Sequence, residues 1–216
     1  MTFQAILFDN DGVLVDTERL YYQANREILG RAGVTLTDAL YVELFLRTAR
    51  GAWHLLGGAL DDGALAALRA ERDRRYEELI AAGDVVVAGA TACVASLARR
   101  YRLAIVTSSD PAPFALAHAR SELLPHFELV LTREHYRNSK PDPEPYLTAV
   151  ERLGVAPERC LVIEDSERGL RAAKAAGLAC WVIPSPLTRD GRFEDADAIL
   201  EDLAAVSDRL LGSKEA

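Results

Sequence analysis

Two aspartates, two residues apart, follow the first apolar run of the chain, residues 3–8. In extended backbone, residues i and i+2 point the same way, so the carboxylates of Asp9 and Asp11 can face one site. Such a pair suits acid–base chemistry or the binding of a cation. Asp-x-Asp-Gly is also a good turn after a strand, so the pair taken alone leaves both a turn and a site open.

Hydroxyl and carboxylate groups follow two later apolar runs. Thr107 and Ser108 come after residues 103–106, where a strand-to-helix junction either cradles a phosphate or caps the helix. Glu164 and Asp165 follow another run, and their oxygens either hold Mg²⁺ or cap the next helix. Each pair by itself leaves the structural and the functional interpretation open.

Lys140 stands just before a predicted helix. Asp142 and Pro143 fit a helix N-cap and the first helical position, which fixes Lys140 ahead of the helix. Its cation is well placed there to neutralise phosphate charge, but a surface lysine is also commonly just solvated. The motif therefore leaves a phosphate-facing lysine and a solvated lysine both open.

The elements that must position these residues follow from hydrophobic periodicity. Short apolar runs without clean alternation are typical of strands buried on both faces. The runs expected as strands are residues 3–8, 103–106, 127–131, 160–163, 180–183 and 198–200. Helical periodicity alternates with the later runs, over residues 91–100, 144–153, 166–176 and 202–211. This alternation predicts an α/β fold with a Rossmann-like parallel sheet and right-handed crossovers.

The carboxyl ends of parallel strands share one edge of a sheet, and ligands bind outside that edge. The acidic pairs, the hydroxyls and the lysine all lie at or near such ends, so we expect them to meet at one site. Four carboxylates gathered there would repel one another, which predicts a bound divalent metal. The complete set of groups is typical of phosphoryl transfer.

Residues 17–82 break the alternation of strands and helices, because they show helical periodicity and no convincing strand. We expect an inserted all-helical cap subdomain over this segment. The core domain is then discontinuous and consists of residues 1–16 and 83–216. The final residues, 212–216, are expected to be frayed.

Four motifs in this order resemble the haloacid dehalogenase superfamily, in the helical-cap subgroup of phosphoglycolate phosphatases and β-phosphoglucomutase-like proteins. The motifs are Phe-Asp-x-Asp-Gly-Val-Leu-x-Asp-Thr-Glu, Ile-Val-Thr-Ser-Ser, Ser-Lys-Pro-Asp-Pro and Val-Ile-Glu-Asp-Ser. The resemblance covers essentially the whole chain. It implies a Mg²⁺-dependent phosphatase that hydrolyses a small phosphorylated metabolite through an aspartyl-phosphate intermediate.

The resemblance also implies roles for individual residues. Asp9 is expected as the nucleophile, Asp11 as the general acid and base, and Lys140 as the cation that steadies the nucleophile and the phosphoryl group. Substrate contacts are expected from Thr107, Ser108, Gly12 and Arg50, and Mg²⁺ ligands from Asp9, Asp11 through its backbone carbonyl, Glu164 and Asp165. The candidate substrate selectors in the cap are Arg47, Arg50, Trp53 and His54, with Trp53 expected in the core.

Four alternatives are weighed against the phosphatase. Dehalogenases of the superfamily lack the second aspartate, so Asp11 argues against them. Sugar phosphomutases with the same cap carry a histidine four residues after the threonine that corresponds to Thr17, where this chain has Tyr21; the β-phosphoglucomutase type is the runner-up. A signalling receiver domain would place its acceptor aspartate on a later strand, and a non-catalytic relative would have a motif residue replaced.

Composition and charge argue against other kinds of partner. The chain has 216 residues with 25 Lys+Arg against 33 Asp+Glu, a net charge of −8, so nucleic acid is not expected as a ligand. Cys93, Cys160 and Cys180 stand singly in apolar runs, which is typical of buried thiols in a reducing compartment. With no leader pattern and no apolar run long enough to span a bilayer, we expect a cytoplasmic monomer or weak homodimer with no membrane partner.

Overall fold

The computed structural model describes residues 2–58 and 60–212. The chain forms two compact units, one from Met1–Asp16 with Val86–Ala216 and the other from Thr17–Val85. The second boundary falls after Val85 instead of after residue 82, because the chain from Val86 onward pairs with the segment that follows the first strand. Of the residues expected to be frayed, 212–216, those from 213 onward lie outside the described residues.

The first unit contains a six-stranded sheet in which all neighbouring strands are parallel. Its order is β3-β2-β1-β4-β5-β6, and the strands are β1 (Ala5–Phe8), β2 (Arg102–Val106), β3 (Leu129–Leu131), β4 (Cys160–Glu164), β5 (Ala179–Val182) and β6 (Ala198–Ile199). The predicted parallel α/β fold is confirmed, with strand ends one or two residues away from the apolar runs. β1 lies between β2 and β4, so the three strands that precede the predicted site are direct neighbours.

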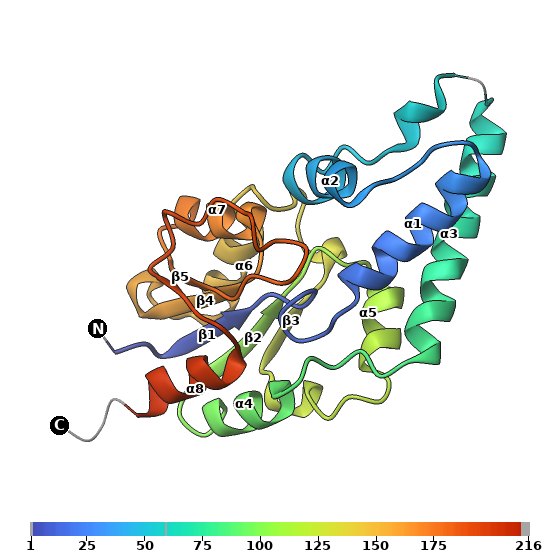
Figure 1. Cartoon of the computed structure of the whole chain (residues 1–216). Helices are drawn as coiled ribbons and strands as arrows, with labels where there is room; N and C mark the ends of the chain where they lie inside the picture. The colour runs from blue at the N-terminus through green and yellow to red at the C-terminus, as the bar shows by residue number, and fades with distance from the viewer. Residues whose placement is uncertain (1, 59, 213–216) are drawn as a thin grey trace. The chain divides into compact units, whose positions relative to one another are not determined.

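Helices cover both faces of this sheet (Figure 1). One face carries α6 (Glu144–Leu153) and α7 (Glu167–Ala175), and the other carries α4 (Ala90–Leu97), α5 (Pro111–His118) and α8 (Leu203–Leu211). The segment of α5 was not predicted as a helix, because it is short and contains two prolines. The predicted cap of α6 is wrong: Pro143 is its N-cap residue, and Asp142 Oδ1 accepts from the backbone N–H of Glu144 at 2.9 Å.

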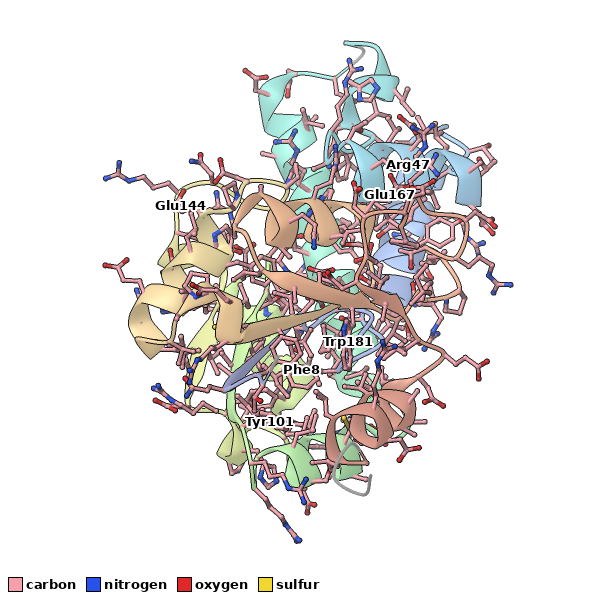
Figure 2. The ribbon with its side chains drawn as sticks, turned by 90° about the vertical axis from the view of Figure 1, so that its left-hand side faces the viewer. Phe8, Arg47, Tyr101, Glu144, Glu167 and Trp181 are labelled. Carbon is pink, nitrogen blue, oxygen red and sulfur yellow. The ribbon has the colours of Figure 1, made fainter. Side chains whose placement is uncertain are left out.

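Alternate residues of the central strand β1 pack into two separate hydrophobic cores, one on each face of the sheet. Ala5 and Leu7 belong to the core under α6 and α7, whereas Ile6 and Phe8 belong to the core under α4, α5 and α8. Figure 2 shows Phe8 among the side chains on the second face of the sheet, where Trp181 also packs. β1 is therefore buried on both faces, as its unbroken apolar run predicts.

The second unit contains helices and no strand among its described residues. Its elements are α1 (Glu18–Arg31), α2 (Asp38–Tyr41), the π-helical η1 (Val42–Arg47), the 3₁₀-helical η2 (Trp53–Leu56) and α3 (Asp62–Ala82). α1 and α3 pack together, and an ion pair between Arg75 Nε and Glu27 Oε2 at 2.7 Å links them. In either unit, no helix within the described residues combines the length and apolarity needed to cross a bilayer.

The expectation that Trp53 lies in the core is wrong. Its side chain is only partly buried, at the start of the short helix η2. The guanidinium groups of Arg69 and Arg72 lie 5.7 and 5.6 Å from its ring centroid. Cation–π packing of this kind accommodates an indole at a surface, so the large ring does not require a core position.

Candidate active site

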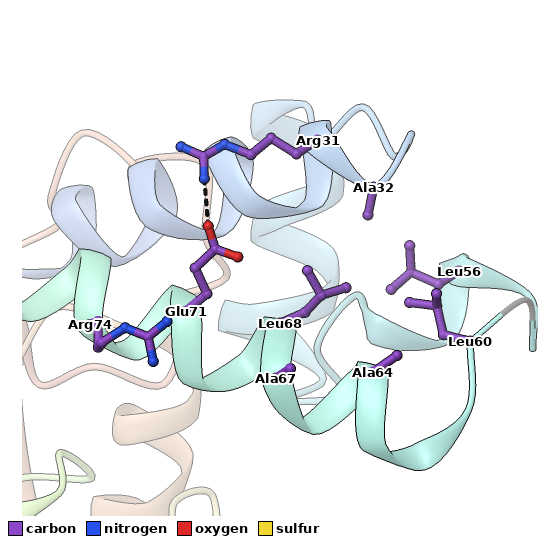
Figure 3. A pocket seen from close by; sticks show the side chains of 9 residues that line it. All are labelled: Arg31, Ala32, Leu56, Leu60, Ala64, Ala67, Leu68, Glu71 and Arg74. Atoms are coloured by element: carbon purple, nitrogen blue, oxygen red, sulfur yellow. Dashed lines mark hydrogen bonds and ion pairs between the residues drawn. The ribbon is translucent and has the colours of Figure 1, made fainter.

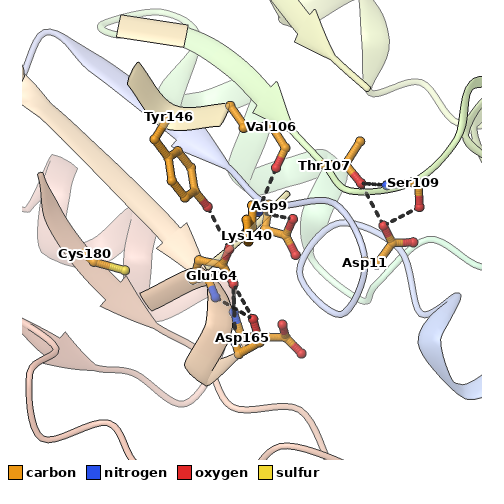
Figure 4. A network of polar contacts seen from close by, with 12 residues as sticks. Asp9, Asp11, Val106, Thr107, Ser109, Lys140, Tyr146, Glu164, Asp165 and Cys180 are labelled. Atoms are coloured by element: carbon orange, nitrogen blue, oxygen red, sulfur yellow. Dashed lines mark hydrogen bonds and ion pairs between the residues drawn. The ribbon is translucent and has the colours of Figure 1, made fainter. Parts of the chain in front are cut away.

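A buried lysine connects the three central strands at their carboxyl ends (Figure 4). Lys140 Nζ donates to Asp9 Oδ1 at 2.6 Å, to Glu164 Oε1 at 2.7 Å and to the carbonyl oxygen of Val106 at 2.9 Å. An ammonium has three N–H donors, so all of them are used. Lys140 is only 4% exposed, which decides between the two readings of its motif: the side chain is not solvated.

The charges of this cluster follow from burial and from the mutual attraction of its members. Burial by itself lowers the pKa of Lys140, but the carboxylates of Asp9 and Glu164 outweigh burial and raise it. Burial by itself raises the pKa of Glu164, but Lys140 outweighs burial and lowers it. For Asp9 burial prevails: it raises the pKa to about 7 against the pull of Lys140, and the charges of Glu164 and Asp11 add to the rise. Lys140 and Glu164 are thus a stable ion pair. Of the carboxyl groups in this cluster, Asp9 is the one whose charged form would be stabilised most by a further cation.

Glu164 is held by donors on both of its carboxylate oxygens. Oε1 accepts from Lys140 and from the hydroxyl of Tyr146 at 2.7 Å. Oε2 accepts from the backbone N–H of Asp165 at 3.1 Å and from the hydroxyl of Ser166 at 3.0 Å. A Cβ atom on Gly169 of α7 would lie 1.7 Å from Oε1, so only glycine leaves room for this carboxylate. Sequence reasoning missed both Tyr146 and Gly169, since each reads as an ordinary position of its helix.

Asp11 is positioned by two hydroxyl groups that follow β2. Thr107 Oγ1 and Ser109 Oγ donate to Asp11 Oδ2 at 2.9 and 2.8 Å. The backbone N–H of Ser109 in turn donates to Thr107 Oγ1 at 3.0 Å. The structure therefore brings Thr107 to the predicted acid, and Ser109 is a further site residue that the sequence reasoning did not single out. Ser108, the predicted neighbour, has a buried Oγ without a hydrogen-bond partner among the described residues.

The acidic residues fit a divalent cation. Asp9, Glu164 and Asp165 each offer a carboxylate oxygen, and these oxygens lie within 4.8 Å of one another. All three residues are buried, and Lys140 is the cation that faces Asp9 and Glu164. The negative charge of these buried carboxylates exceeds the positive charge of Lys140. Hard carboxylate oxygens are the ligands that Mg²⁺ prefers. The residues present therefore suit the predicted metal.

Gly12 completes the acidic site from the loop after β1. Its φ angle is +86°, a conformation that side chains other than glycine rarely adopt. A Cβ atom on Gly12 would lie 2.3 Å from Asp165 Oδ2. This glycine is thus required twice, once for the turn and once for the approach of the Asp165 carboxylate, although its predicted role was contact with the substrate.

The predicted cap residues belong to the other compact unit, Thr17–Val85. Arg50 and His54 are exposed in and near the segment between η1 and η2. Arg47 lies 3.7 Å from Glu43 in a surface ion pair. Selection of substrate by these residues stays a prediction.

A pocket in the helical unit is lined by side chains of a different kind from those at the sheet edge. It has a volume of about 530 Å³ and is lined by Arg31, Ala32, Leu56, Leu60, Ala64, Ala67, Leu68, Glu71 and Arg74 (Figure 3). Its walls are mainly apolar, and the carboxylate of Glu71 is paired with Arg31 at 2.5 Å. Because this lining holds neither a pair of acids nor a hydroxyl group, the chemistry predicted from the motifs belongs to the sheet edge.

The carboxyl edge of the parallel sheet carries an Asp–Lys–Glu cluster and a second aspartate that is bound by hydroxyl groups. These features together define a class of α/β hydrolases. The model of the haloacid dehalogenase-like hydrolase family matches residues 3–177, and the chain belongs to this family. The resemblance seen in the four motifs is thereby confirmed. Together with relatives named as phosphatases, this membership makes the chain a hydrolase of phosphoric monoesters.

Three relatives illustrate the family members to which this chain is similar. Protein CbbY of Rhodobacter capsulatus is 33% identical, over 96% of this chain and 96% of that protein. Fructose-1-phosphate phosphatase YqaB of Escherichia coli is 31% identical, over 82% of this chain and 94% of its own length. The crystal structure of a CbbY mutant from Rhodobacter sphaeroides with xylulose-(1,5)bisphosphate superposes with a TM-score of 0.77 at 30% identity, covering 94% of this chain and 96% of that one.

Gly12→Ala is expected to have an effect beyond the loss of stability that backbone strain causes. Alanine at positive φ costs about 1–2 kcal/mol, and the added methyl group would also push the Asp165 carboxylate away from the acidic site. The matched control is Gly89→Ala, whose φ of +83° is similar but whose Cβ would meet nothing within 4 Å. Urea denaturation should show a loss in both variants, and calorimetric titration with Mg²⁺ should show weakened binding in Gly12→Ala alone. Equal Mg²⁺ affinities in the two variants would contradict the close approach to Asp165.

Lys140→Met is expected to lower the free energy of unfolding by about 3–5 kcal/mol, because two buried carboxylates lose their counter-ion. Without the ammonium the pKa of Glu164 rises above its unfolded value, and the pKa of Asp9, which burial already raises, rises further. The folded state is therefore penalised more as pH increases and the two carboxyl groups ionise. The deficit should therefore be larger at about pH 8 than at about pH 6. Lys174→Met is the control, because it removes a surface ion pair with Asp197 at 2.8 Å and should cost under about 1 kcal/mol. A similar, pH-independent loss in both variants would show that burial of the charge is not the cause.

Proposed function

We propose that this chain is a Mg²⁺-dependent phosphatase that hydrolyses a phosphorylated sugar through an aspartyl-phosphate on Asp9. The observation that carries the proposal is the arrangement of two aspartates with opposite surroundings. Asp9 is bound by the Lys140 ammonium, whereas Asp11 is bound by the hydroxyls of Thr107 and Ser109. A carboxylate beside a fixed cation suits a nucleophile, and a carboxyl group held by neutral donors suits a proton carrier.

The proposed reaction has two steps. In the first, a carboxylate oxygen of Asp9 attacks phosphorus, the ester P–O bond breaks, and Asp11 gives a proton to the departing sugar oxygen. In the second, water attacks the phosphorus of the acyl phosphate while Asp11 takes a proton from that water. The P–O bond to Asp9 breaks, the carboxylate of Asp9 is restored, and inorganic phosphate leaves. Lys140 keeps Asp9 Oδ1 in place throughout, so the other carboxylate oxygen is the one that reacts.

The proposed ligands of Mg²⁺ are the carboxylates of Asp9 and Asp165 and the backbone carbonyl of Asp11. Glu164 was also expected as a ligand, but its two oxygens accept from Lys140, Tyr146 and the segment at Ser166. We assign it the role of holding Lys140. When bound, Mg²⁺ supplies positive charge that offsets the charge of the nucleophile and of the phosphoryl oxygens.

A phosphorylated sugar is proposed as the substrate because of the relatives. They include fructose-1-phosphate phosphatase YqaB, the phosphorylated carbohydrates phosphatase of Thermotoga maritima, which is 33% identical over 81% of this chain, and the CbbY complex with xylulose-(1,5)bisphosphate. The helical unit Thr17–Val85 is proposed as the cap that selects the sugar, with Arg50 among the selecting residues.

The surroundings of Tyr21 favour the phosphatase over the mutase. The hydroxyl of Tyr21 accepts a hydrogen bond from Arg72 Nη1 at 2.5 Å, and the Arg72 guanidinium also lies 4.7 Å from the Tyr21 ring centroid. Burial raises the pKa of Tyr21 despite the opposing effect of Arg72. A phenol that stays protonated near neutral pH cannot act as the base that the family's mutases supply with a histidine at this position.

Asp11→Asn is expected to slow hydrolysis in a way that depends on the leaving group. Alkyl phosphates need a proton on the departing oxygen, so their kcat should fall by about 10²–10⁴-fold, whereas p-nitrophenyl phosphate should lose less. Asp9→Asn should abolish turnover of both substrates, because an amide does not attack phosphorus. Circular dichroism of both variants serves as the check on folding. Equal losses on the two substrates for Asp11→Asn would contradict the acid and base role.

The function itself is tested by ³¹P NMR of β-glucose 1-phosphate and fructose 1-phosphate incubated with the enzyme and Mg²⁺. We expect inorganic phosphate to appear from at least one of them, and no signal to change in the presence of EDTA. Accumulation of glucose 6-phosphate would instead identify a phosphomutase. Activity that survives both EDTA and Asp9→Asn would overturn the proposed chemistry.

A further inference from the structure

A buried histidine on α5 contacts the loop that separates the two catalytic aspartates. His118 Nε2 lies 2.8 Å from Asn10 Oδ1, and His118 Nδ1 lies 2.8 Å from Ser121 Oγ. Asn10 is 1% exposed and His118 is 4% exposed, so water does not compete for this contact. His118 lies outside the motifs that indicate phosphoryl transfer, and Asn10 occupies the variable position of the first motif, between Asp9 and Asp11.

The partners of His118 fix its protonation state. An amide oxygen only accepts hydrogen bonds, so Nε2 carries the proton that is donated to Asn10. Nδ1 then accepts from the hydroxyl of Ser121. Burial lowers the pKa of His118 to about 4, against the opposing effect of Asp11, which agrees with a neutral ring. The contact is therefore a fixed, neutral hydrogen bond and not a titrating one.

Asn10 is the fixed point of the loop that carries Asp11. Its backbone carbonyl accepts from the N–H groups of Val13, Leu14 and Val15 at 3.3, 2.8 and 3.0 Å. The loop residues that follow, including Asp11, turn around this carbonyl. A shift of Asn10 would thus move Asp11, whose neighbours in the sequence share the same turn.

The amide of Asn10 is retained at an energetic cost. Its Nδ2 has no hydrogen-bond partner among the described residues, although the side chain is fully buried. An unsatisfied buried donor costs about 1–3 kcal/mol, whereas an apolar pair of similar shape in place of Asn10 and His118 would avoid that cost. Packing alone therefore does not account for the pair.

The same two segments of chain are already tied together at the active site. α5 follows directly after the segment that contains Thr107 and Ser109, whose hydroxyls hold Asp11. The His118–Asn10 bond adds a second tie between the loop after β1 and the segment after β2. This second tie restrains the loop at Asn10 as well as at Asp11.

We propose that His118 is a positioning residue for the reaction: through Asn10 it fixes the loop after β1 so that the Asp11 carboxyl group meets the departing sugar oxygen. The inference rests on the proposed function, because it assigns His118 to the proton-transfer step of that function. The inference predicts a loss of activity whose size depends on the leaving group of the substrate. A general loss of stability would not produce that dependence.

The test compares His118→Leu with His118→Gln on an alkyl phosphate and on p-nitrophenyl phosphate. For His118→Leu we expect kcat on the alkyl phosphate to fall by about 10- to 100-fold with little change in KM, as for a small misplacement of a catalytic group, and a much smaller fall on p-nitrophenyl phosphate. His118→Gln places an N–H donor near the position of Nε2 and should restore most of the loss. Phe114→Leu is the matched control: it lies one turn earlier on α5 with its ring 4.5 Å from that of His118, and should lower stability without changing the ratio between substrates.

The double variant Asn10→Leu/His118→Leu separates positioning from stability. Removing both polar groups should recover the free energy of unfolding lost in His118→Leu, while the selective loss on the alkyl phosphate persists. The double variant also allows the substrate comparison to be made if His118→Leu does not fold. Recovery of both stability and kcat, or equal losses on both substrates, would overturn the proposal. Asp9→Asn is measured alongside: activity in that variant would refute the proposed function, whereas an inactive Asp9→Asn with equal losses for His118→Leu would refute the positioning role alone.

Discussion

The charge on Lys140 has to be balanced where water cannot reach it, and the arrangement of the central strands follows from that requirement. Its three partners come from the ends of three adjacent strands, Asp9 after β1, Val106 in β2 and Glu164 in β4. The register makes this possible, because Phe8 of β1 pairs with Ile105 of β2 and with Ile163 of β4, so the next residue of each strand lies at the same level. A shift of β1 or β4 by one residue would turn its side chains to the opposite face and take one of the two carboxylates away from the ammonium. Breaking such a buried pair costs about 3–5 kcal/mol, a large part of the stability of a domain.

The surroundings of Glu164 show how the fold accommodates this charge. The carboxylate needs donors on both oxygens, and α6 supplies the hydroxyl of Tyr146 while the start of α7 supplies Ser166. The carboxylate also needs space, which Gly169 provides. The two helices on this face of the sheet therefore do more than cover apolar residues. They complete the coordination of an ion pair that the strands begin, and this leaves Asp9 as the acid whose charge depends on a further cation.

The strands and the position of the site could be predicted from the sequence, whereas its supporting residues could not. Apolar runs identify strands directly, and the carboxyl ends of parallel strands always meet, so Asp9, Thr107 and Glu164 were expected together. Tyr146, Ser109 and His118 gain their roles from contacts between segments far apart in the chain, and no local pattern distinguishes them from ordinary helix or loop residues. Local rules were also inexact: Trp53 is only partly buried and packs against Arg69 and Arg72. Asp142 accepts from the N–H of the first residue of α6, although the N-cap position itself belongs to Pro143.

The hydroxyl of Thr107 links the proposed binding of phosphate to the positioning of Asp11. Thr107 has one hydroxyl proton, which it donates to Asp11 Oδ2 in this structure. It cannot donate the same proton to a phosphoryl oxygen, so under the proposed function the arrival of substrate removes one of the two hydroxyl donors from Asp11. Ser109 and the loop anchored at Asn10 then hold the acid. The segment after β2 and the loop after β1 thus both position Asp11, so under the proposed function the acid keeps its place when Thr107 turns to the phosphoryl group.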